Sequence, residues 1–342
     1  MSSPARQSMK VGVIGAGWVA ANRHLPAIQR SGLGQVAAVC DHSRERALSV
    51  APRGVPIFTD PAELLAADLD AVVICTPPHS HAELAMASVR AGRHTLVEKP
   101  FALTSAEGRR VAEAGRESGV SLAVGHNFLF SRSALAAQAE IASGAAGDPV
   151  WALGLQTSSW QRRLPVWRDT LPGGLFFDEA PHLLYLMRKF LGELTVSRSE
   201  ITNYSPDGGS QLVDARLNGA RGNAQLLMWT GAPHSEWVLT LYCTRATLVI
   251  DLFRDILIKL PAERYHGIRD VVGISCTATL QHWAGTLSTG VRSLAGRQDY
   301  GANRLMSSFL SSAITRSAPP VSGEDGWRVV ELIEQIRDAA NK

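Results

Sequence analysis

The stretch VGVIGAGWVA (residues 11–20) decides the fold expected for this chain. Its apolar start predicts a buried strand, and small residues then occupy the three positions of a GxGxxG/A turn leading into a helix, namely Gly15, Gly17 and Ala20. The first position makes a tight turn, the second lets a pyrophosphate approach the backbone, and the third packs the helix on the strand. Because a helix N-terminus attracts anions, we expect cofactor contacts from Gly15, Gly17, Trp18 and Val19. By itself the turn is also compatible with a glycine loop that only requires positive φ angles.

A second apolar strand, residues 36–40, ends at Asp41, roughly 20 residues after the glycine turn. A carboxylate at this place accepts the ribose hydroxyls of NAD and repels a 2′-phosphate, so NAD is favoured over NADP. Arg44 leaves two interpretations open. Its guanidinium could bind that phosphate, or it is a solvated residue in the first turn of the next helix.

The segment LVEKP (residues 96–100) places Glu98 and Lys99 at the end of a further apolar run. Ligands of open α/β sheets bind at the carboxyl ends of the strands. One domain is therefore expected to hold both a dinucleotide and a lysine. A proton donor beside a hydride carrier indicates a dehydrogenase.

Composition narrows the classes of protein. The 342 residues are long enough for two domains, and a net charge of +3 without a lysine-arginine block gives little support to nucleic-acid binding. The four cysteines are far apart and are interpreted as small core residues in a reducing cytoplasm, without disulfides or a metal site: Cys40, Cys75, Cys243 and Cys276. With no secretory signal and no run of 18 apolar residues, we expect a cytoplasmic protein without a membrane span.

The pattern of the chain changes near residue 126. Before it, short apolar strands alternate with helical segments, as in parallel α/β domains. After it, strand-like runs separated by turns such as residues 206–209 predict a mainly antiparallel sheet with helices around residues 174–191 and 326–340. We therefore expect a disordered tail (1–8), an NAD(P)-binding α/β Rossmann domain (9–126) and an α+β domain with a large, mainly antiparallel sheet (127–342) for substrate binding and oligomerisation.

Four segments make the chain resemble the glucose-fructose oxidoreductase / inositol dehydrogenase / MocA (Gfo/Idh/MocA) family of NAD(P)-dependent oxidoreductases. They are residues 11–20, CTPPHSHAELAMASVRAGRHTLVEKP (75–100), VWRDTLPGGLFFDEAPHLLYL (166–186) and PPVSGEDGWRVVELIE (319–334). The resemblance implies a Rossmann domain, a second domain whose open sheet face forms a homodimer or homotetramer, and a sugar-like or polyol substrate bound between the domains. It also implies that Lys99 is the catalytic lysine with a cis bond to Pro100. The residues that support this lysine or line the cofactor would be Glu98, Thr76, Pro77 and His81.

The same resemblance matches Asp178 and His182 to an Asp-x-x-x-His pair. Residues four apart share a helix face, so Asp178 could hold His182 as a general acid/base. Pro181, however, is comfortable only in a first helical turn, which leaves open that Asp178 simply caps a helix beginning near it.

Candidate substrate contacts depart in part from the family pattern: Asn127, Trp167, Arg168 and Tyr185. Trp167 and Arg168 fall on a family motif, whereas Tyr185 stands where many relatives have aspartate. Nearby residues either add polar and stacking contacts to a sugar-like ligand or form a surface loop held by buried tryptophans: Trp160, Arg162 and Arg163.

The function expected is an NAD-dependent oxidoreductase that interconverts a secondary alcohol and a ketone on a sugar, cyclitol or related polyol, with Lys99 and His182 as proton-transfer groups. One alternative is an imine or enone reductase, or an oxidation-elimination enzyme, on the same fold. Another is a catalytically silent NAD-binding regulator. Lys99, Asp178 and His182 argue against the regulator, because a sensor needs no proton-transfer groups.

An apolar stripe recurs at helical spacing within residues 278–295, formed by Leu280, Trp283, Leu287, Val291 and Leu294. We expect it to be buried against the protein or a sister subunit. The alternative is an interfacial membrane helix.

Overall fold

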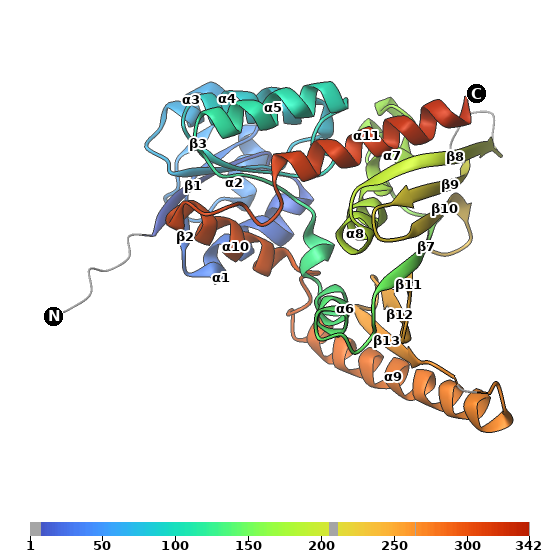
Figure 1. The fold of residues 1–342 in the computed structure, drawn as a ribbon. Coiled ribbons are helices and arrows are strands. Elements are labelled where there is room, and N and C mark those ends of the chain that lie inside the picture. Colours follow the sequence, from blue (N-terminus) through green and yellow to red (C-terminus); the bar gives the residue numbers. More distant parts are fainter. Residues whose placement is uncertain (1–7, 205–210, 264, 342) are drawn as a thin grey trace. The chain divides into compact units, whose positions relative to one another are not determined.

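The computed structural model describes residues 8–204, 211–263 and 265–341, and its contacts divide the chain into two compact units (Figure 1). The first unit comprises Met1–His126 and Ala302–Glu331, and the second comprises Asn127–Gly301 and Leu332–Lys342. Sequence reasoning assigned residues 302–331 to the second domain, but they pack with the first unit, where α10 (Ala302–Thr315) contacts α1 (Leu25–Ser31). Residues 1–7 of the expected tail and the turn at 206–209 lie outside the described residues.

The first unit is built on a parallel six-stranded sheet in the order β3-β2-β1-β4-β5-β6. Its strands are β1 (Met9–Ile14), β2 (Gly34–Cys40), β3 (Ile57–Phe58), β4 (Ala71–Ile74), β5 (His94–Val97) and β6 (Leu122–Val124). Every residue of β4 is buried, as expected for a parallel strand covered on both faces. The strand order reverses beside β1, so the carboxyl ends of β1 and β4 meet where ligands of this architecture bind.

Helices cover both faces of that sheet; in Figure 1, α3, α4 and α5 lie on one face, and α1 and α10 on the other. The remaining bounds are η1, a π-helix (Ala20–His24), α2 (Arg44–Val50), α3 (Pro61–Ala66), η2 (Pro78–Ser80), α4 (His81–Arg90), α5 (Ser105–Glu117) and α11 (Gly323–Ala340). Local chemistry sets several of these starts. The Asp60 carboxylate accepts the Ala62 N–H at 2.8 Å, and Thr104 and Glu107 form a capping box.

The second unit contains a seven-stranded sheet in the order β13-β12-β11-β7-β10-β9-β8. Its strands are β7 (Pro149–Ser159), β8 (Leu194–Asn203), β9 (Gln211–Gly219), β10 (Asn223–Ala232), β11 (Glu236–Cys243), β12 (Ala246–Asp251) and β13 (Ile256–Pro261). β7 and β10 pair in parallel and the other neighbours are antiparallel, which confirms the predicted fold class.

Helices of the second unit are η3 (Asn127–Phe130), α6 (Arg132–Ala142), η4 (Val166–Thr170), α7 (Leu175–Glu179), α8 (Pro181–Leu191) and α9 (Ile268–Leu294). The helix expected around residues 174–191 is divided between α7 and α8, because Pro181 has no N–H to continue the helical ladder. α8 packs on one face of the sheet, where Gly154 of β7 leaves room for Leu183 and Met187.

The cysteines only partly follow the expectation. Cys40 is buried and Cys75 and Cys243 are half-buried, but Cys276 is exposed on α9, so its interpretation as a core residue was wrong. Within the described ranges, no helix is long and apolar enough to cross a membrane.

Candidate functional site

The glycine turn after β1 has two different spatial requirements. Gly15 has a φ of 95°, and a Cβ there would lie 2.7 Å from the carbonyl carbon of Cys75, so only glycine fits between the ends of β1 and β4. Gly17 is exposed, and a Cβ built on it meets no atom within 4 Å. Ala20 is fully buried beneath the helix that follows. The turn thus combines a packed glycine with an open backbone surface, as close approach of a pyrophosphate requires.

Trp18 and Val19 stand at the beginning of that helix. Trp18 is exposed, and the guanidinium of Arg23 lies 5.5 Å from the centre of its ring. Val19 is half-buried. Their contact with a cofactor stays a prediction.

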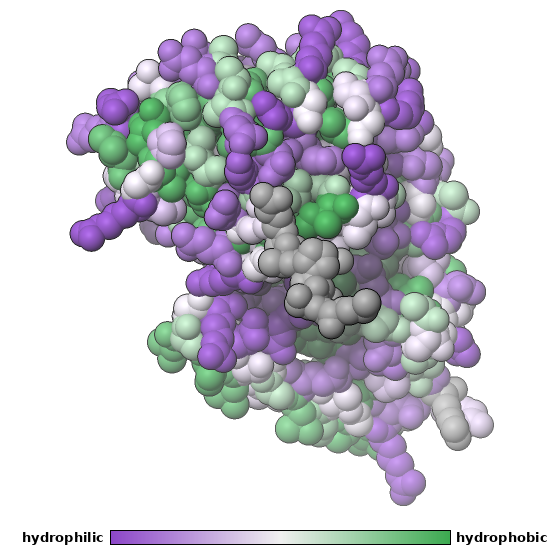
Figure 2. Space-filling view, turned by 90° about the vertical axis from the view of Figure 1, so that its left-hand side faces the viewer, coloured by the Kyte–Doolittle hydropathy of each residue, from purple (hydrophilic) through white to green (hydrophobic). Residues whose placement is uncertain are grey.

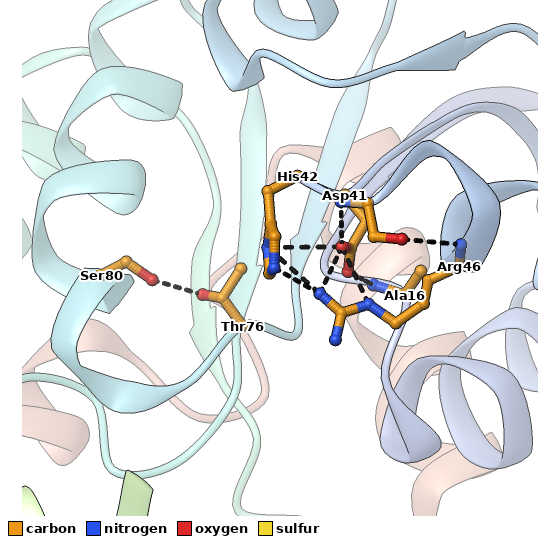
Figure 3. A network of polar contacts seen from close by, with 7 residues as sticks. Ala16, Asp41, His42, Arg46, Thr76 and Ser80 are labelled. Atoms are coloured by element: carbon orange, nitrogen blue, oxygen red, sulfur yellow. Dashed lines mark hydrogen bonds and ion pairs between the residues drawn. The ribbon is translucent and has the colours of Figure 1, made fainter.

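Asp41 joins the end of β2 to the glycine turn (Figure 3). Its carboxylate accepts the N–H of Ala16 at 2.9 Å and that of Ser43 at 2.8 Å. Burial raises the pKa of the Asp41 carboxyl, but these two N–H groups and the guanidinium of Arg46 outweigh burial and lower it. A carboxylate charged at neutral pH therefore lies beside the turn, where ribose hydroxyls would need an acceptor.

The arginine that pairs with Asp41 is Arg46. Its Nη2 lies 2.9 Å from Oδ1 of Asp41 and 2.6 Å from Nε2 of His42. Arg44, considered from the sequence, is exposed in the first turn of α2. The first turn of α2 directs residue 46 toward the end of β2 and residue 44 toward solvent. The distance of each residue from Asp41 along the sequence does not reveal this difference.

The end of β4 supplies Thr76 and Pro77. Thr76 accepts the Ser80 hydroxyl at 2.8 Å, and Pro77 is exposed. His81 is buried, with Nδ1 2.6 Å from the carbonyl oxygen of Pro100 and Nε2 2.8 Å from that of Thr76. Burial lowers the pKa of His81 more than these contacts raise it. His81 therefore links the loop at Thr76 to Pro100. The peptide bond between Lys99 and Pro100 is cis, as expected.

Glu98 anchors the lysine segment through a buried pair that sequence reasoning missed. Nε2 of His24 donates to Oε1 of Glu98 at 2.6 Å, while Oε2 accepts the N–H of Lys99 at 3.0 Å. Burial alone would raise the pKa of the Glu98 carboxyl, but the hydrogen bond and charge of His24 and the charge of Lys99 lower it to about 2. His24 ends η1, and an ionisable residue directly before the apolar residues 25–28 was the available signal.

The second unit holds a buried polar-aromatic cluster around His182. Nδ1 of His182 lies 3.1 Å from the hydroxyl of Tyr185, which also accepts the N–H of Phe128 at 3.1 Å. The rings of Phe128 and Trp237 each lie 5.0 Å from the imidazole, edge-on and tilted respectively. Asn127 is buried beside this cluster and donates to the carbonyl of Tyr300 at 2.9 Å. The cluster fixes the orientation of the imidazole.

Asp178 does not cap α8. It lies half-buried within α7, and the N-cap of α8 is Ala180, whose φ of −55° and ψ of −32° are helical. The backbone therefore turns helically from Asp178 to His182, which favours a shared side for the two residues. Asp178 and His182 belong to the second unit and Lys99 to the first.

Glu179, next to Asp178, is a buried acid that sequence reasoning passed over. It accepts hydrogen bonds from Ser158 and from Gln156, the latter at 3.4 Å, and pairs with Arg162 at 2.5 Å. Arg162 therefore anchors the loop after β7. The second acid of LFFDEA, in an otherwise apolar segment, could have signalled such a buried pair.

The other loop candidates are more exposed. Trp160 and Arg163 are on the surface, so Trp160 is not one of the buried tryptophans considered from the sequence. Trp167 and Arg168 are half-buried in η4, where Arg168 pairs with Asp169 at 3.0 Å. Substrate binding by these residues stays a prediction.

The parallel sheet, the glycine turn and the carboxylate after β2 have the arrangement of a dinucleotide-binding Rossmann domain. Residues 9–126 match the sequence profile of the Gfo/Idh/MocA family, described as "Oxidoreductase family, NAD-binding Rossmann fold". The match covers the Rossmann domain, and this part of the chain is therefore similar to that family.

Named relatives are similar over part of their length. The chain is 30% identical to 1,5-anhydro-D-fructose reductase of Ensifer adhaerens over 216 residues, which cover 61% of this chain and 65% of that protein. It is 31% identical to inositol 2-dehydrogenase 1 of Saccharopolyspora erythraea over 220 residues, covering 61% and 63%. These matches span less than two thirds of either relative.

Similarity of fold extends further. The structure of levoglucosan dehydrogenase in complex with NADH and levoglucosan matches with a TM-score of 0.80 over 98% of each chain, at 20% sequence identity. At that identity the match establishes the fold of both units and no more.

Proposed function

We propose that this protein is an NAD-dependent oxidoreductase that interconverts a secondary alcohol and a ketone on a sugar, cyclitol or related polyol. The observation that carries the proposal is the Asp41 carboxylate hydrogen-bonded to the turn of Gly15 and Gly17, in a chain that also retains Lys99 at the carboxyl end of β5. The relatives named for anhydrofructose and inositol support the substrate class.

The residues of the first unit fit an NAD molecule. The open surface at Gly17 and the helix N-terminus after it suit a pyrophosphate, and the Asp41 carboxylate suits the ribose hydroxyls. NAD would supply the hydride acceptor, and NADH the donor.

Lys99 and His182 then have proton-handling roles. The ammonium of Lys99 would orient the substrate hydroxyl and exchange its proton at Nζ, while Glu98 fixes the backbone of the lysine. His182, oriented by Tyr185 and two aromatic rings, would act as a second acid/base, with Asp178 about one helical turn before it in the chain. Substrate contacts are proposed for Asn127, Trp167, Arg168 and Tyr185.

NAD is proposed over NADP because Asp41 is charged and lies beside the turn. Arg46 and His42 are the groups that would receive a 2′-phosphate, but in this structure Arg46 is already paired with Asp41. Because Asp41 neutralises the charge of Arg46, this arginine attracts a 2′-phosphate less, which favours an unphosphorylated ribose.

The test combines binding with turnover. NAD should raise the unfolding temperature, because a ligand that binds only the folded state stabilises it by about 2.7 kcal/mol at 100 times its Kd. NADH formation should then appear with at least one member of a panel of inositols, sugars and anhydrosugars.

One variant serves as the control. Lys99→Met should reduce NADH formation by about 10² or more while keeping the thermal shift with NAD. A shift with NAD but no product from any panel member in the wild type would instead support the silent regulator, and the absence of any shift would remove NAD from the proposal.

A further inference from the structure

α9 carries its apolar residues on the outside. The outer stripe, as we name this set, has exposed fractions of 69% for Leu280, 62% for Trp283, 65% for Leu287, 67% for Val291 and 92% for Leu294. The expectation that this stripe is buried against its own chain is therefore wrong for the described residues. At the height of α9 in Figure 1, the space-filling view shows apolar patches interspersed with polar side chains (Figure 2).

The inner face of α9 holds the helix in this orientation. The side-chain amide of Gln281 accepts the N–H of Lys259 at 2.9 Å and donates to its carbonyl at 3.0 Å, on the outermost strand β13. A Cβ at Gly285 would lie 2.7 Å from the side chain of Ile256. Rolling α9 to bury the outer stripe would break the amide contacts and force larger residues into the place of Gly285.

The size of the outer stripe suits a protein interface. Taking roughly 100 Å² for each large apolar side chain, five of them expose on the order of 500 Å². That is as large as the largest apolar patch of a typical monomer, about 300–600 Å². Two copies in contact would bury about 1,000 Å² in total, which is the lower limit of a specific interface.

The distribution of charge on α9 favours a protein partner over a membrane surface for the outer stripe. Residues 271–291 contain no Asp, Glu, Lys or Arg. Interfacial membrane helices usually present Lys and Arg on their polar face. The polar face here is instead occupied by β13 and by Arg132, which lies 3.4 Å from the Ser288 hydroxyl.

We infer that the outer stripe of α9 docks against the same stripe of a second copy of this chain. Leu280, Leu287 and Leu294 are seven residues apart and repeat on one side, the spacing at which two helices interlock. A two-fold contact uses the same patch on both partners. Leu287 lies midway along the stripe, so it meets its own copy whether the helices run parallel or antiparallel.

Cysteine cross-linking tests this geometry. In a Cys276→Ser background, which removes the exposed native thiol on the same side, Leu287→Cys should form a covalent dimer on mild oxidation. The control is Ser293→Cys, which is exposed and about a third of a turn away around the helix. Equal dimer yields from the two variants, or none from Leu287→Cys, would overturn the inference.

Mass measurement provides the second test. Sedimentation over a concentration series should show Leu287→Asp with half the mass of the wild type and an unchanged unfolding temperature, because Leu287 is exposed. An unchanged mass, or a monomeric wild type, would refute the contact. Co-sedimentation of the wild type with phosphatidylcholine-phosphatidylglycerol vesicles, lost in Leu287→Asp at unchanged mass, would assign the stripe to a membrane instead.

Discussion

Replacing His24 with leucine should both destabilise the first unit and slow turnover. The substitution removes the N–H that binds Glu98 at 2.6 Å. It leaves a buried carboxylate that still has to hold the backbone of Lys99 through its other oxygen. Nδ1 of His24 is buried without a hydrogen-bond partner among the described residues, so Glu98 is the polar contact through which the ring acts.

The expected magnitude follows from burial and from proton affinity. Removing one partner of a buried ion pair costs about 3–5 kcal/mol. Independently, a Glu98 pKa lowered from 4.5 to about 2 corresponds to roughly 3 kcal/mol, at about 1.4 kcal/mol per tenfold change in proton affinity. We therefore expect His24→Leu to lose about 3 kcal/mol of unfolding free energy near pH 7. His24→Gln, which keeps an N–H donor, should lose about 1 kcal/mol.

The loss should depend on pH in a defined direction. Because the pKa of Glu98 is lower in the folded protein, its carboxylate stabilises the fold fully above about 4.5 and progressively less as the pH falls toward 2. The stability gap between wild type and His24→Leu should therefore shrink in acid.

Urea unfolding at several pH values, together with kcat and KM for NAD, measures both effects. Turnover should fall more in His24→Leu than in His24→Gln, with NAD affinity within a few fold of the wild type. A loss below about 1 kcal/mol near pH 7, or a gap that does not change with pH, would refute the reasoning.

Three further outcomes are expected. Asp41→Asn keeps an acceptor for the Ala16 N–H but loses the charge, so the Kd for NADH should rise about tenfold or more while NADPH binds more tightly than in the wild type; an unchanged ratio in fluorescence titrations would contradict the role of Asp41. Lys99→Met should reduce kcat by about 10² or more with the Kd for NAD within a few fold, and near-normal turnover would remove Lys99 from the chemistry. Arg162→Ala should lower the free energy of unfolding by about 3 kcal/mol, because the buried carboxylate of Glu179 then lacks a cation. In urea titrations, the double variant with Glu179→Gln should recover part of that loss. Equal stability of the single and double variants would show that the pair is not coupled.

The sequence was most informative where a local pattern has one structural solution. Gly15, Gly17 and Asp41 could be placed from the sequence. The glycine turn follows the first strand, the carboxylate follows the second strand, and the length of chain between them is nearly fixed in this architecture. The end of β2 at Cys40 agrees with the strand predicted at residues 36–40 for a similar reason, since an apolar run acts over a few residues.

Contacts between distant residues were beyond that reasoning. His24 and Glu98 are 74 residues apart, and their meeting depends on the register of a π-helix that periodicity does not reveal. Sequence reasoning considered Arg44 and not Arg46, because the side of α2 that faces the strand end was not evident from the sequence. The outward orientation of α9 was likewise invisible, because a helical stripe shows which residues lie together but not whether anything covers them.

Gln281 has a consequence for solubility. A strand at the border of a sheet offers unsatisfied N–H and C=O groups to any passing chain, and it is a common starting point for aggregation. At Lys259 of β13 both backbone groups are already taken by one side-chain amide, which imitates the pairing of an additional strand. The Lys259 ammonium adds a charge paired with Glu140 at 2.6 Å. α9 therefore closes the sheet against edge-to-edge growth at this point, while its other side remains available for association through side chains.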